Sequence, residues 1–177
     1  MTVPAERFIA VPAAVVVEAA AGDRAAFTEL VATYHPDMIR LAMVVTRDAD
    51  LANDAAQAAW HQAWQKLRQL RDPGRIRPWL LSIAANEARQ ALRRRSHLVA
   101  MPDPMTDSPS PEQDPIDAME LARALGTLRP DERQLIGLRY VSGFSAPELG
   151  EIFGISPEGV RSRLKRILAR LRKELDE

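Results

Sequence analysis

The sequence predicts an all-α protein with two small helical domains, joined by an acidic linker that is rich in proline. Apolar residues recur at spacings of three and four over most of the 177 residues, and no stretch alternates with period two. Residues 98–115 hold five of the thirteen prolines, which interrupt helices and central strands. Each side of this linker is long enough for a small helical domain.

The expected order is an N-terminal tail (1–14), a first domain (15–97), the linker (98–115) and a second domain (116–177). The first domain should hold three long helices near residues 24–45, 50–70 and 77–95. Pro78 suits the first turn of the third of these helices. The second domain should begin with helices near 117–128 and 129–143, and Pro130 suits the first position of the latter.

The formal net charge is zero, but the two signs are segregated along the chain. Residues 64–97 hold nine Lys or Arg against two acids, and residues 156–177 hold seven against four. Between them, residues 101–120 hold six acids and no Lys or Arg. Two basic blocks around an acidic one indicate a polyanionic partner.

Several classes of protein are disfavoured by composition. The chain has no cysteine, which excludes disulfides and thiolate metal sites and agrees with a reducing cytosol. His35, His61 and His97 are too scattered to suggest a metal site. No nucleophile–base pair or phosphate loop is evident, so we expect neither an enzyme nor a cofactor. No apolar run reaches the ~20 residues of a membrane span, so we expect no membrane insertion.

Residues 145–166 predict a helix-turn-helix. Ser145 suits an N-cap, and Glu148 three residues later completes a capping box. Gly154 can take the left-handed conformation that ends the first helix, and Ser156 can cap the second. The second helix would present a basic face to the DNA major groove. A solvated basic face on a simple helical hairpin is the alternative interpretation.

A second basic surface is predicted where the helix near 77–95 ends, at Arg89, Arg93, Arg94 and Arg95. Cations also suit a helix C-terminus, so this cluster alone permits a purely structural interpretation. Upstream, Arg68, Arg71, Arg75 and Arg77 surround a turn next to Trp79. Basic residues beside an aromatic ring suit single-stranded nucleic acid, although Trp60, Trp64 and Trp79 each also suit a packed core.

On these motifs, the sequence resembles the bacterial RNA polymerase sigma factors of the extracytoplasmic-function (ECF) group of the sigma-70 family. The resemblance covers roughly residues 15–97, as sigma region 2, and 116–175, as region 4. "DLANDAAQAAWHQAW" is similar to the helix that docks on the clamp of the core enzyme. "WLLSIAANEARQALRRR" is similar to the segment that captures the −10 element as melted single strand, and "LRPDERQLIGLRYVSGFSAPELGEIFGISPEGVRSRL" to the domain that reads the −35 element.

The resemblance implies three groups of site residues. The group for the −10 element consists of Arg75, Arg77, Trp79, Asn86, Arg89, Arg93, Arg94 and Arg95. The group for the −35 element consists of Ser156, Glu158, Gly159, Arg161, Ser162, Arg163, Lys165 and Arg166. The group for docking on core polymerase consists of Leu51, Asp54, Gln57, Trp60 and Trp64.

The implied function is that of a cytoplasmic transcription initiation factor. It would bind the clamp and flap elements of core RNA polymerase, read and melt the −10 element, and read the −35 element, so that it contacts promoter DNA both as duplex and as melted strand. An anti-sigma factor is a further partner that the resemblance allows. The alternatives are a conventional helix-turn-helix regulator that binds duplex operator DNA without polymerase, and an adaptor that holds polymerase without initiating.

The chain departs from the family pattern at a few positions. Asn53 and Ala58 stand where the family usually has acids, so the docking face is less acidic than usual. Ala85 replaces a common arginine before Asn86, and Gly159 replaces a common threonine in the −35 helix. We expect these departures to affect how strongly the chain binds core polymerase and which bases its −35 helix reads.

Overall fold

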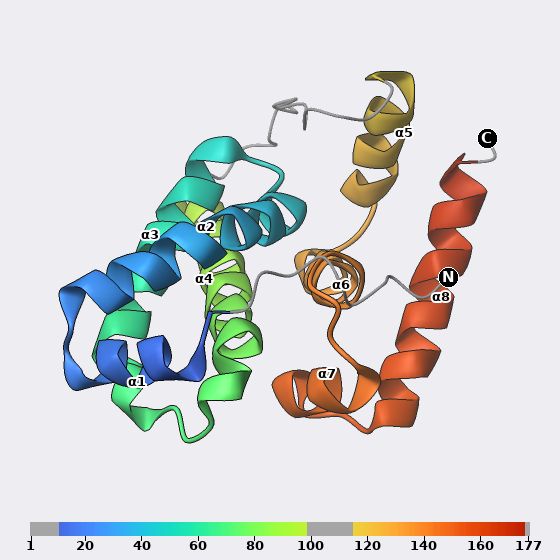
Figure 1. Cartoon of the computed structure of the whole chain (residues 1–177). Coiled ribbons are helices and arrows are strands. Elements are labelled where there is room, and N and C mark those ends of the chain that lie inside the picture. The colour runs from blue at the N-terminus through green and yellow to red at the C-terminus, as the bar shows by residue number, and fades with distance from the viewer. Residues whose placement is uncertain (1–10, 99–114, 176–177) are drawn as a thin grey trace.

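The computed structural model describes residues 11–98 and 115–175, and every regular element within them is helical. The expected tail up to residue 10 and the linker residues 99–114 lie outside the described residues. Figure 1 shows two groups of helices side by side. The first group is α1 (Ala13–Ala21), α2 (Arg24–Thr46), α3 (Ala49–Lys66) and α4 (Ile76–Leu98), and the second is α5 (Pro115–Gly126), α6 (Pro130–Ile136), α7 (Ala146–Phe153) and α8 (Pro157–Leu175). The predicted all-α class with two helical units is confirmed.

Short segments connect these helices. Two 3₁₀ turns, η2 (Leu67–Gln69) and η3 (Pro73–Arg75), join α3 to α4 where the sequence predicted a turn. A π-helical segment, η4 (Gly137–Val141), extends α6, and the N–H of Ser142 donates to the Gly137 carbonyl at 3.1 Å. No helix in the described part of the chain combines the length and the apolar character needed to cross a membrane.

Caps fix the limits of the long helices in the first group. The Asp23 carboxylate accepts from the Ala26 N–H at 2.9 Å, and Asp48 accepts from the Leu51 N–H at 2.9 Å. These bonds satisfy backbone donors that have no partner within a helix. Arg47 ends α2 with a φ of 57°. Only residues 47–48 therefore separate α2 from α3.

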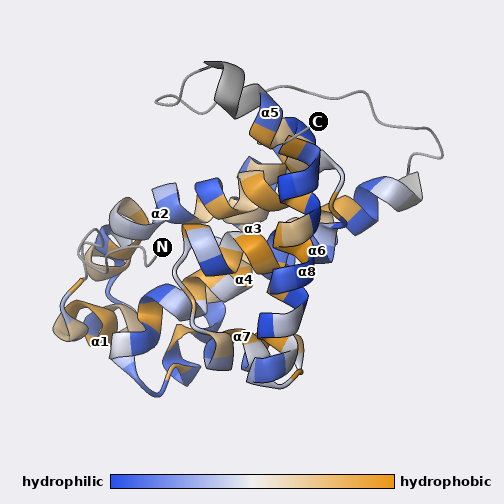
Figure 2. Cartoon of the chain, turned by 90° about the vertical axis from the view of Figure 1, so that its right-hand side faces the viewer, coloured by the Kyte–Doolittle hydropathy of each residue, from blue (hydrophilic) through white to orange (hydrophobic). Residues whose placement is uncertain are grey.

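The core of the first group lies where α2, α3 and α4 pack together. Leu30 and Met38 of α2 and Leu81 of α4 are fully buried there. The α3 helix contributes small side chains, and its buried alanines are Ala52, Ala55, Ala56, Ala59 and Ala63. Small residues let the neighbouring helices approach closely, and Figure 2 shows the hydrophobic faces of these helices turned inward.

The second group is built on the predicted helix-turn-helix. Ser145 and Glu148 form the capping box, and Gly154 ends α7 with a φ of 65°. A Cβ at Gly150 would lie 2.7 Å from the Ile155 carbonyl oxygen, so glycine allows the close approach of α7 to the turn. The α8 helix buries Val160, Leu164, Ile167 and Leu171, whereas Leu175, at its last residue, is 44% exposed.

The two groups share one continuous hydrophobic core. Helix α6, seen nearly end-on in Figure 1, lies against α2 and α4. A Cβ on Gly137, at the end of α6, would lie 2.7 Å from Leu41 Cδ1 and 3.3 Å from Val44 Cγ1 of α2. The second group therefore packs directly on the first.

Candidate nucleic-acid and polymerase interfaces

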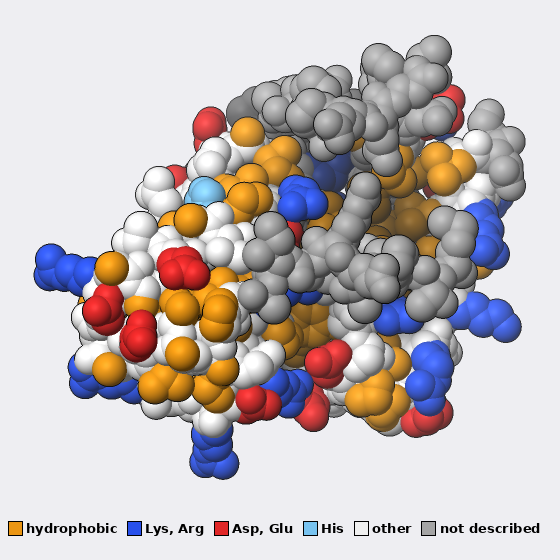
Figure 3. All heavy atoms as spheres, in the orientation of Figure 1, with side chains coloured by type: hydrophobic (Ala, Val, Ile, Leu, Met, Phe, Trp, Pro, Cys, Tyr) orange, Lys and Arg blue, Asp and Glu red, His pale blue; other side chains and the backbone are white. Residues whose placement is uncertain are grey.

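The basic face of α8 is held outward by the helix-turn-helix. The Ser156 hydroxyl accepts from the Gly159 N–H at 3.1 Å and caps the helix. One side of α8 is apolar and packs on α6 and α7. The residues on the opposite side of α8, which recur at spacings of three and four, therefore reach solvent. The exposed members of the predicted −35 group are Ser156, Glu158, Arg161, Ser162, Lys165 and Arg166. In Figure 3, Lys and Arg side chains line the right-hand edge of the molecule over α8.

Two predicted −35 residues have other surroundings. Arg163 is only partly exposed, and its Nη2 forms an ion pair with Asp131 of α6. Gly159 is partly buried, and a Cβ there would lie 3.3 Å from Ser156 Oγ. Arg161 is exposed and pairs with Glu158 one turn earlier. Arg163 thus holds α8 on α6, while Arg161 remains on the solvent side of the helix.

The predicted −10 group lies along α4 and the turn before it. The Asp72 carboxylate accepts from the Gly74 N–H at 2.9 Å and shapes η3, which places Arg75 just before α4 and Arg77 in its first turn. Arg75 is exposed, with its Nη2 at 3.7 Å from a Glu148 oxygen and 3.9 Å from a Glu151 oxygen. Arg77 is largely buried. Its Nε and Nη2 donate to Asp37 Oδ2 at 3.1 and 2.9 Å.

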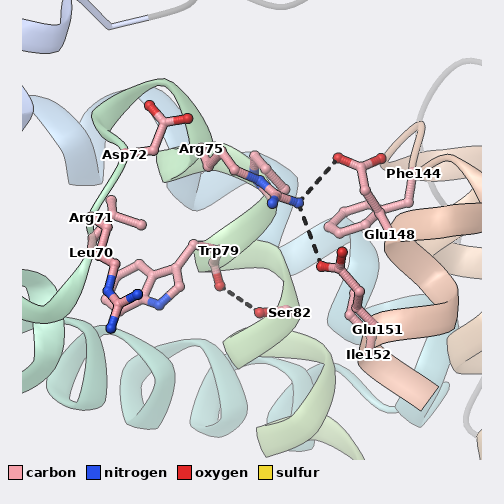
Figure 4. Close-up of a pocket in the computed structure, with 11 residues that line it drawn as sticks. Leu70, Arg71, Asp72, Arg75, Trp79, Ser82, Phe144, Glu148, Glu151 and Ile152 are labelled. Atoms are coloured by element: carbon pink, nitrogen blue, oxygen red, sulfur yellow. Dashed lines mark hydrogen bonds and ion pairs between the residues drawn. The ribbon is translucent and has the colours of Figure 1, made fainter. Parts of the chain in front are cut away.

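A cavity of about 370 Å³ separates this turn from α7. Figure 4 shows Trp79 on one side, with Phe144, Glu148, Glu151 and Ile152 on the other. The Trp79 side chain is partly buried and packs on the core, so one part of the ring faces the cavity and another the protein. The cavity joins an aromatic surface to the Arg75 guanidinium.

The remaining −10 candidates lie farther along α4. Asn86 is partly buried, and its Oδ1 accepts from Gln134 Nε2 of α6 at 3.2 Å. Arg93 and Arg94 are exposed. Arg95 pairs with Asp48, the cap of α3. The end of α4 therefore offers exposed guanidinium groups, while its middle faces the second group of helices.

One more −10 candidate, Arg89, is partly buried, and among the described residues its Nε has no hydrogen-bond partner. It lies one helical turn from Asn86, on the side of α4 that meets the second group of helices. The sequence grouped Arg89 with Arg93 and Arg94 on one basic surface. In the structure, Arg89 lies between these two exposed arginines and the part of α4 that contacts α6.

The predicted docking group divides into exposed and buried residues. Asp54 and Gln57 are exposed on α3, and Trp64 is 41% exposed. Trp60 is 8% exposed, and its Nε1 donates to His35 Nδ1 at 3.2 Å. Leu51 is half-buried near the start of the helix. The solvent face of α3 thus combines polar groups with one large aromatic surface.

Phe27 of α2 supports both tryptophans. Its ring meets Trp60 edge-on with centroids 5.5 Å apart, and Trp64 edge-on at 4.7 Å. Such edge-to-face pairs are favourable arrangements of aromatic rings. The exposed Trp64 ring therefore packs against Phe27 on one side and faces solvent on the other.

Two carboxylates in these surfaces have lowered pKa values. Burial alone would raise the pKa of Glu148, but donors from the Ser145 hydroxyl and N–H, with Arg75 nearby, hold it below its ordinary value. The Leu51 N–H lowers the pKa of Asp48 most, burial opposes the shift, and Arg95 adds to it. Both groups are therefore carboxylates at neutral pH.

The sequence did not identify the residues that join the two groups of helices. Arg133 is 8% exposed, and its Nε donates to the Val45 carbonyl of α2 at 2.8 Å. Gln134 is fully buried, and its Nε2 donates to Asn86 Oδ1 of α4 at 3.2 Å. The run "DERQ" of four polar residues within a short helix is the one local sign that α6 packs against polar partners.

Comparison with known proteins matches both halves of the chain. Residues 30–98 match the family Sigma-70 region 2, and residues 124–173 match Sigma-70, region 4. The chain is 34% identical over 162 residues to the RNA polymerase sigma factor CarQ of Myxococcus xanthus. This match covers 88% of this chain and 92% of CarQ. It is 32% identical over 188 residues to the ECF RNA polymerase sigma factor SigD of Mycobacterium tuberculosis, covering 99% of this chain and 87% of SigD.

A third relative is longer. The probable RNA polymerase sigma factor RfaY of Xanthomonas campestris is 33% identical over 168 residues, which cover 89% of this chain but only 42% of RfaY.

Solved structures show the same fold. CnrH, in complex with the cytosolic domain of CnrY, superposes with a TM-score of 0.69 at 28% identity, over 93% of this chain and 96% of that one. The sigma factor RpoE of Bartonella quintana, in complex with the anti-sigma factor NepR, superposes with a TM-score of 0.74 at 25% identity. The superposition covers 85% of this chain and 96% of RpoE. The chain belongs to the ECF group of the sigma-70 family of RNA polymerase sigma factors, which are transcription initiation factors.

Proposed function

We propose that this chain binds core RNA polymerase and directs it to promoters by reading a −35 element with α8 and a melted −10 element with α4. One observation carries the proposal: a capped helix-turn-helix with an exposed basic face lies on the same chain as a second basic helix of sigma region 2. A conventional operator-binding regulator would need only the first of these. The presence of both sigma regions disfavours that alternative.

The exposed side of α8 supplies the −35 contacts in this proposal. Arg161, Lys165 and Arg166 are exposed and lie on one face, with Ser162 between them. A helix of this kind enters the major groove with its N-terminal half, where arginine binds guanine edges or phosphates. Arg163 contributes chiefly by holding the helix on α6 through Asp131.

The α4 helix and the cavity beside it supply the −10 contacts. The exposed Arg93 and Arg94 would bind the backbone of the melted strand, because single-strand sites combine basic grooves with aromatic surfaces. Trp79, on the cavity wall, offers the surface on which an unstacked base can pack. Asn86 would contact a base through its amide.

The face of α3 formed by Asp54, Gln57 and Trp64 is the proposed docking surface for core polymerase. An exposed aromatic ring flanked by polar groups is typical of residues that dominate binding energy. Asn53, which replaces an acid of the family pattern, is exposed on this face, and its side-chain amide donates to the Ala49 carbonyl at 2.8 Å. The docking surface therefore carries less negative charge than that pattern.

A protein partner that restrains the factor is part of the proposal. CnrH was solved with the cytosolic domain of CnrY, and RpoE with the anti-sigma factor NepR. By similarity to both, we propose that this chain also has an anti-sigma factor and acts in the cytoplasm. Its role is to bind and position, without an enzymatic activity of its own.

The test is transcription with purified core polymerase on sheared genomic DNA of the source bacterium, followed by mapping of start sites. The wild-type chain should give defined start sites that core enzyme alone does not give. A double variant, R161A with K165A, should lose most of them. The control is R172A, an exposed arginine on the same helix beyond the helix-turn-helix, which should keep them. Absence of start sites with the wild-type chain, or equal activity of the double variant, would contradict the proposal.

A further inference from the structure

Two arginine side chains that none of the proposed interfaces uses meet at the turn between α5 and α6. Arg133 of α6 donates through Nη1 to the Leu128 carbonyl of this turn at 2.6 Å. Arg47, which ends α2, lies against the same turn two residues earlier: a Cβ on Gly126 would be 2.5 Å from its Nη1 and 3.0 Å from its Cζ. Both guanidinium groups therefore lie at residues 126–128, one from region 2 and one from region 4.

Glycine at position 126 gives Arg47 the space that it occupies. Nη2 of Arg47 is 3.3 Å from the position that a Cβ would take. The backbone of Gly126 does not have a positive φ, so its conformation would accept a larger residue. The missing side chain thus allows the guanidinium to approach the turn, and no bend of the chain requires it.

Neither arginine has a carboxylate partner among the residues that the structure describes. The acids next to them along the chain form ion pairs elsewhere. Asp48, Asp131 and Glu132 pair with Arg95, Arg163 and Arg170, respectively. The turn itself, "GTL", carries no acid. The two positive charges therefore lie together without a full negative charge from the described chain.

Burial makes this arrangement costly for Arg133. The residue is 8% exposed, and its Nε donates to the Val45 carbonyl at 2.8 Å. Val45 lies in the last turn of α2, where the helix dipole supplies only about half of a negative charge. Burial lowers the pKa of the Arg133 guanidinium, and the nearby positive charge of Arg47 lowers it further. A buried cation needs a compensating anion, and the carbonyl groups provide that compensation only in part.

The remaining donors of the two arginines can be reached by a ligand. The bonds of Arg133 use Nε and Nη1, so within the described chain Nη2 keeps its hydrogens for a further acceptor. Arg47 is partly exposed, and no hydrogen bond holds its guanidinium in the same part of the chain. Guanidinium groups bind oxyanions through parallel N–H groups, and such charge-assisted bonds are stronger than neutral ones. Two of these groups at one turn can therefore share the oxygens of a single tetrahedral anion.

We propose that Arg47 and Arg133 form a binding site for a small oxyanion of the phosphate class, at the turn between α5 and α6. The ligand is inorganic phosphate or the phosphoryl group of a small phosphomonoester. It supplies the negative charge that the described chain lacks there, and it links the end of α2 to α6. Promoter recognition by α4 and α8 takes no part in this site, so the site and the proposed function can fail separately.

Phosphate titration of the purified full chain tests the site. Isothermal titration calorimetry measures binding, and thermal unfolding measures the stabilisation that binding to the folded chain produces. Potassium chloride replaces phosphate in the reference samples, so that the ionic strength stays constant. The wild-type chain should bind phosphate with saturation, and its Tm should rise with phosphate above the value in chloride.

A neutral substitution of the more exposed arginine is the first variant. R47Q removes one guanidinium and leaves Arg133 in place, so the phosphate concentration for half-saturation should rise at least about tenfold. The control is R24A, which removes an exposed arginine, with the same unit of charge, from the other end of α2. That end lies about 33 Å away, beyond the screening length of ~8 Å, so R24A should change the half-saturating concentration by less than about twofold.

A second variant moves the arginine without changing any charge. In G126A the new Cβ would meet Arg47 Nη1 at 2.5 Å, and the guanidinium is the flexible end that must shift. Alanine suits the end of α5, so the variant should keep its helix content by circular dichroism. Because charge-assisted bonds depend on geometry, phosphate binding should weaken at least about fivefold in G126A.

Glycerol 3-phosphate, titrated in place of inorganic phosphate, distinguishes the two sources of the ligand. Binding of both probes would assign the site to phosphoryl groups in general, and binding of inorganic phosphate alone would assign it to the free ion; either result supports the site. Equal stabilisation of the wild-type chain by phosphate and by chloride would overturn the proposal. Unchanged phosphate affinity in R47Q, or in folded G126A, would overturn it as well.

Discussion

Arg170 and Glu132 form a two-point ion pair that ties α8 to α6. The distance from Nη1 to Oε1 is 2.9 Å, and that from Nη2 to Oε2 is 3.1 Å. Glu132 Oε2 also accepts from the backbone N–H of Arg129 at 3.0 Å and so helps to cap α6. Glu132 is 6% exposed, whereas Arg170 is exposed. A single buried acid thus connects the start of α6 to α8.

Replacing this acid by its neutral amide should destabilise region 4. E132Q keeps an acceptor for Arg129 but removes the carboxylate that Arg170 binds through both Nη atoms, so that Glu174 is the acid left near this guanidinium. Because the pair is buried on one side only, we expect a loss of about 1–2 kcal/mol in the free energy of unfolding, between that of an exposed pair and a buried one. Urea unfolding at pH 7 measures it. The control E29Q, at an exposed acid of α2, should change the free energy by less than about 0.5 kcal/mol.

Stability should also fall at acidic pH through the same carboxylate. Burial raises the pKa of Glu132, but the bonds from Arg170 and the Arg129 N–H outweigh it, so the pKa is lowered in the folded chain. A lowered pKa stabilises the fold above the unfolded value of about 4.3 and loses that effect as the pH falls through the folded value. Urea titrations from pH 7 to pH 3 should show this decline. The slope should be smaller in E132Q, and equal slopes in both chains would contradict the assignment.

Arg161 and Arg163 should separate DNA binding from stability. R161A removes an exposed guanidinium, so the assembled holoenzyme should lose about 1–3 kcal/mol of promoter affinity, as for a lost base contact. R163A removes the partner of Asp131 and should lower the free energy of unfolding by about 1 kcal/mol. Fluorescence anisotropy with labelled promoter DNA and thermal unfolding measure the two effects. A larger affinity loss in R163A than in R161A would reverse the assignment.

The sequence predicted local structure well because the signals are local. Ser145, Glu148 and Gly154 each act within one turn of helix, so the capping box and the left-handed end of α7 could be read directly and are confirmed. Helix α4 continues to Leu98 and α5 begins at Pro115, and the linker limits of 98 and 115 stay a prediction. The roles of the site residues stay predictions.

The contact between regions 2 and 4 could not be predicted in the same way. Gln134 and Asn86 are 48 residues apart, and Arg133 and Val45 are 88 apart. Helical periodicity reports which face of each helix is buried, but not which other helix covers it. Arg77 illustrates the consequence: its charge suggested DNA, while its bonds to Asp37 and Ser142 depend on two other helical segments.

The close approach at Gly150 should make this glycine more sensitive than Gly154. In G150A the new Cβ would lie 2.7 Å from a backbone oxygen, so α7 and the turn must move apart, at a cost of about 1–3 kcal/mol. In G154A no atom lies within 4 Å, and only the left-handed φ is strained, which costs about 1–2 kcal/mol. Urea unfolding gives both values. G150A should also weaken promoter binding, because it moves α8; a chain in which only G154A does so would contradict this geometry.

Trp60 and Trp64 should respond differently to truncation although both lie on α3 and touch Phe27. Trp60 is 8% exposed, so W60A should cost about 3–5 kcal/mol of stability, as for other large core residues. Trp64 is 41% exposed, so W64A should cost less than half as much.

If α3 docks on core polymerase, W64A should weaken that binding by at least about 2 kcal/mol, the value typical of a central aromatic contact. Denaturation curves give the stabilities, and titration of a labelled chain with core enzyme gives the affinities. The variant Q62A, at a half-buried polar residue of the same helix, is the control for general effects on α3. A W64A chain that binds core enzyme as tightly as wild type would remove this residue from the docking surface.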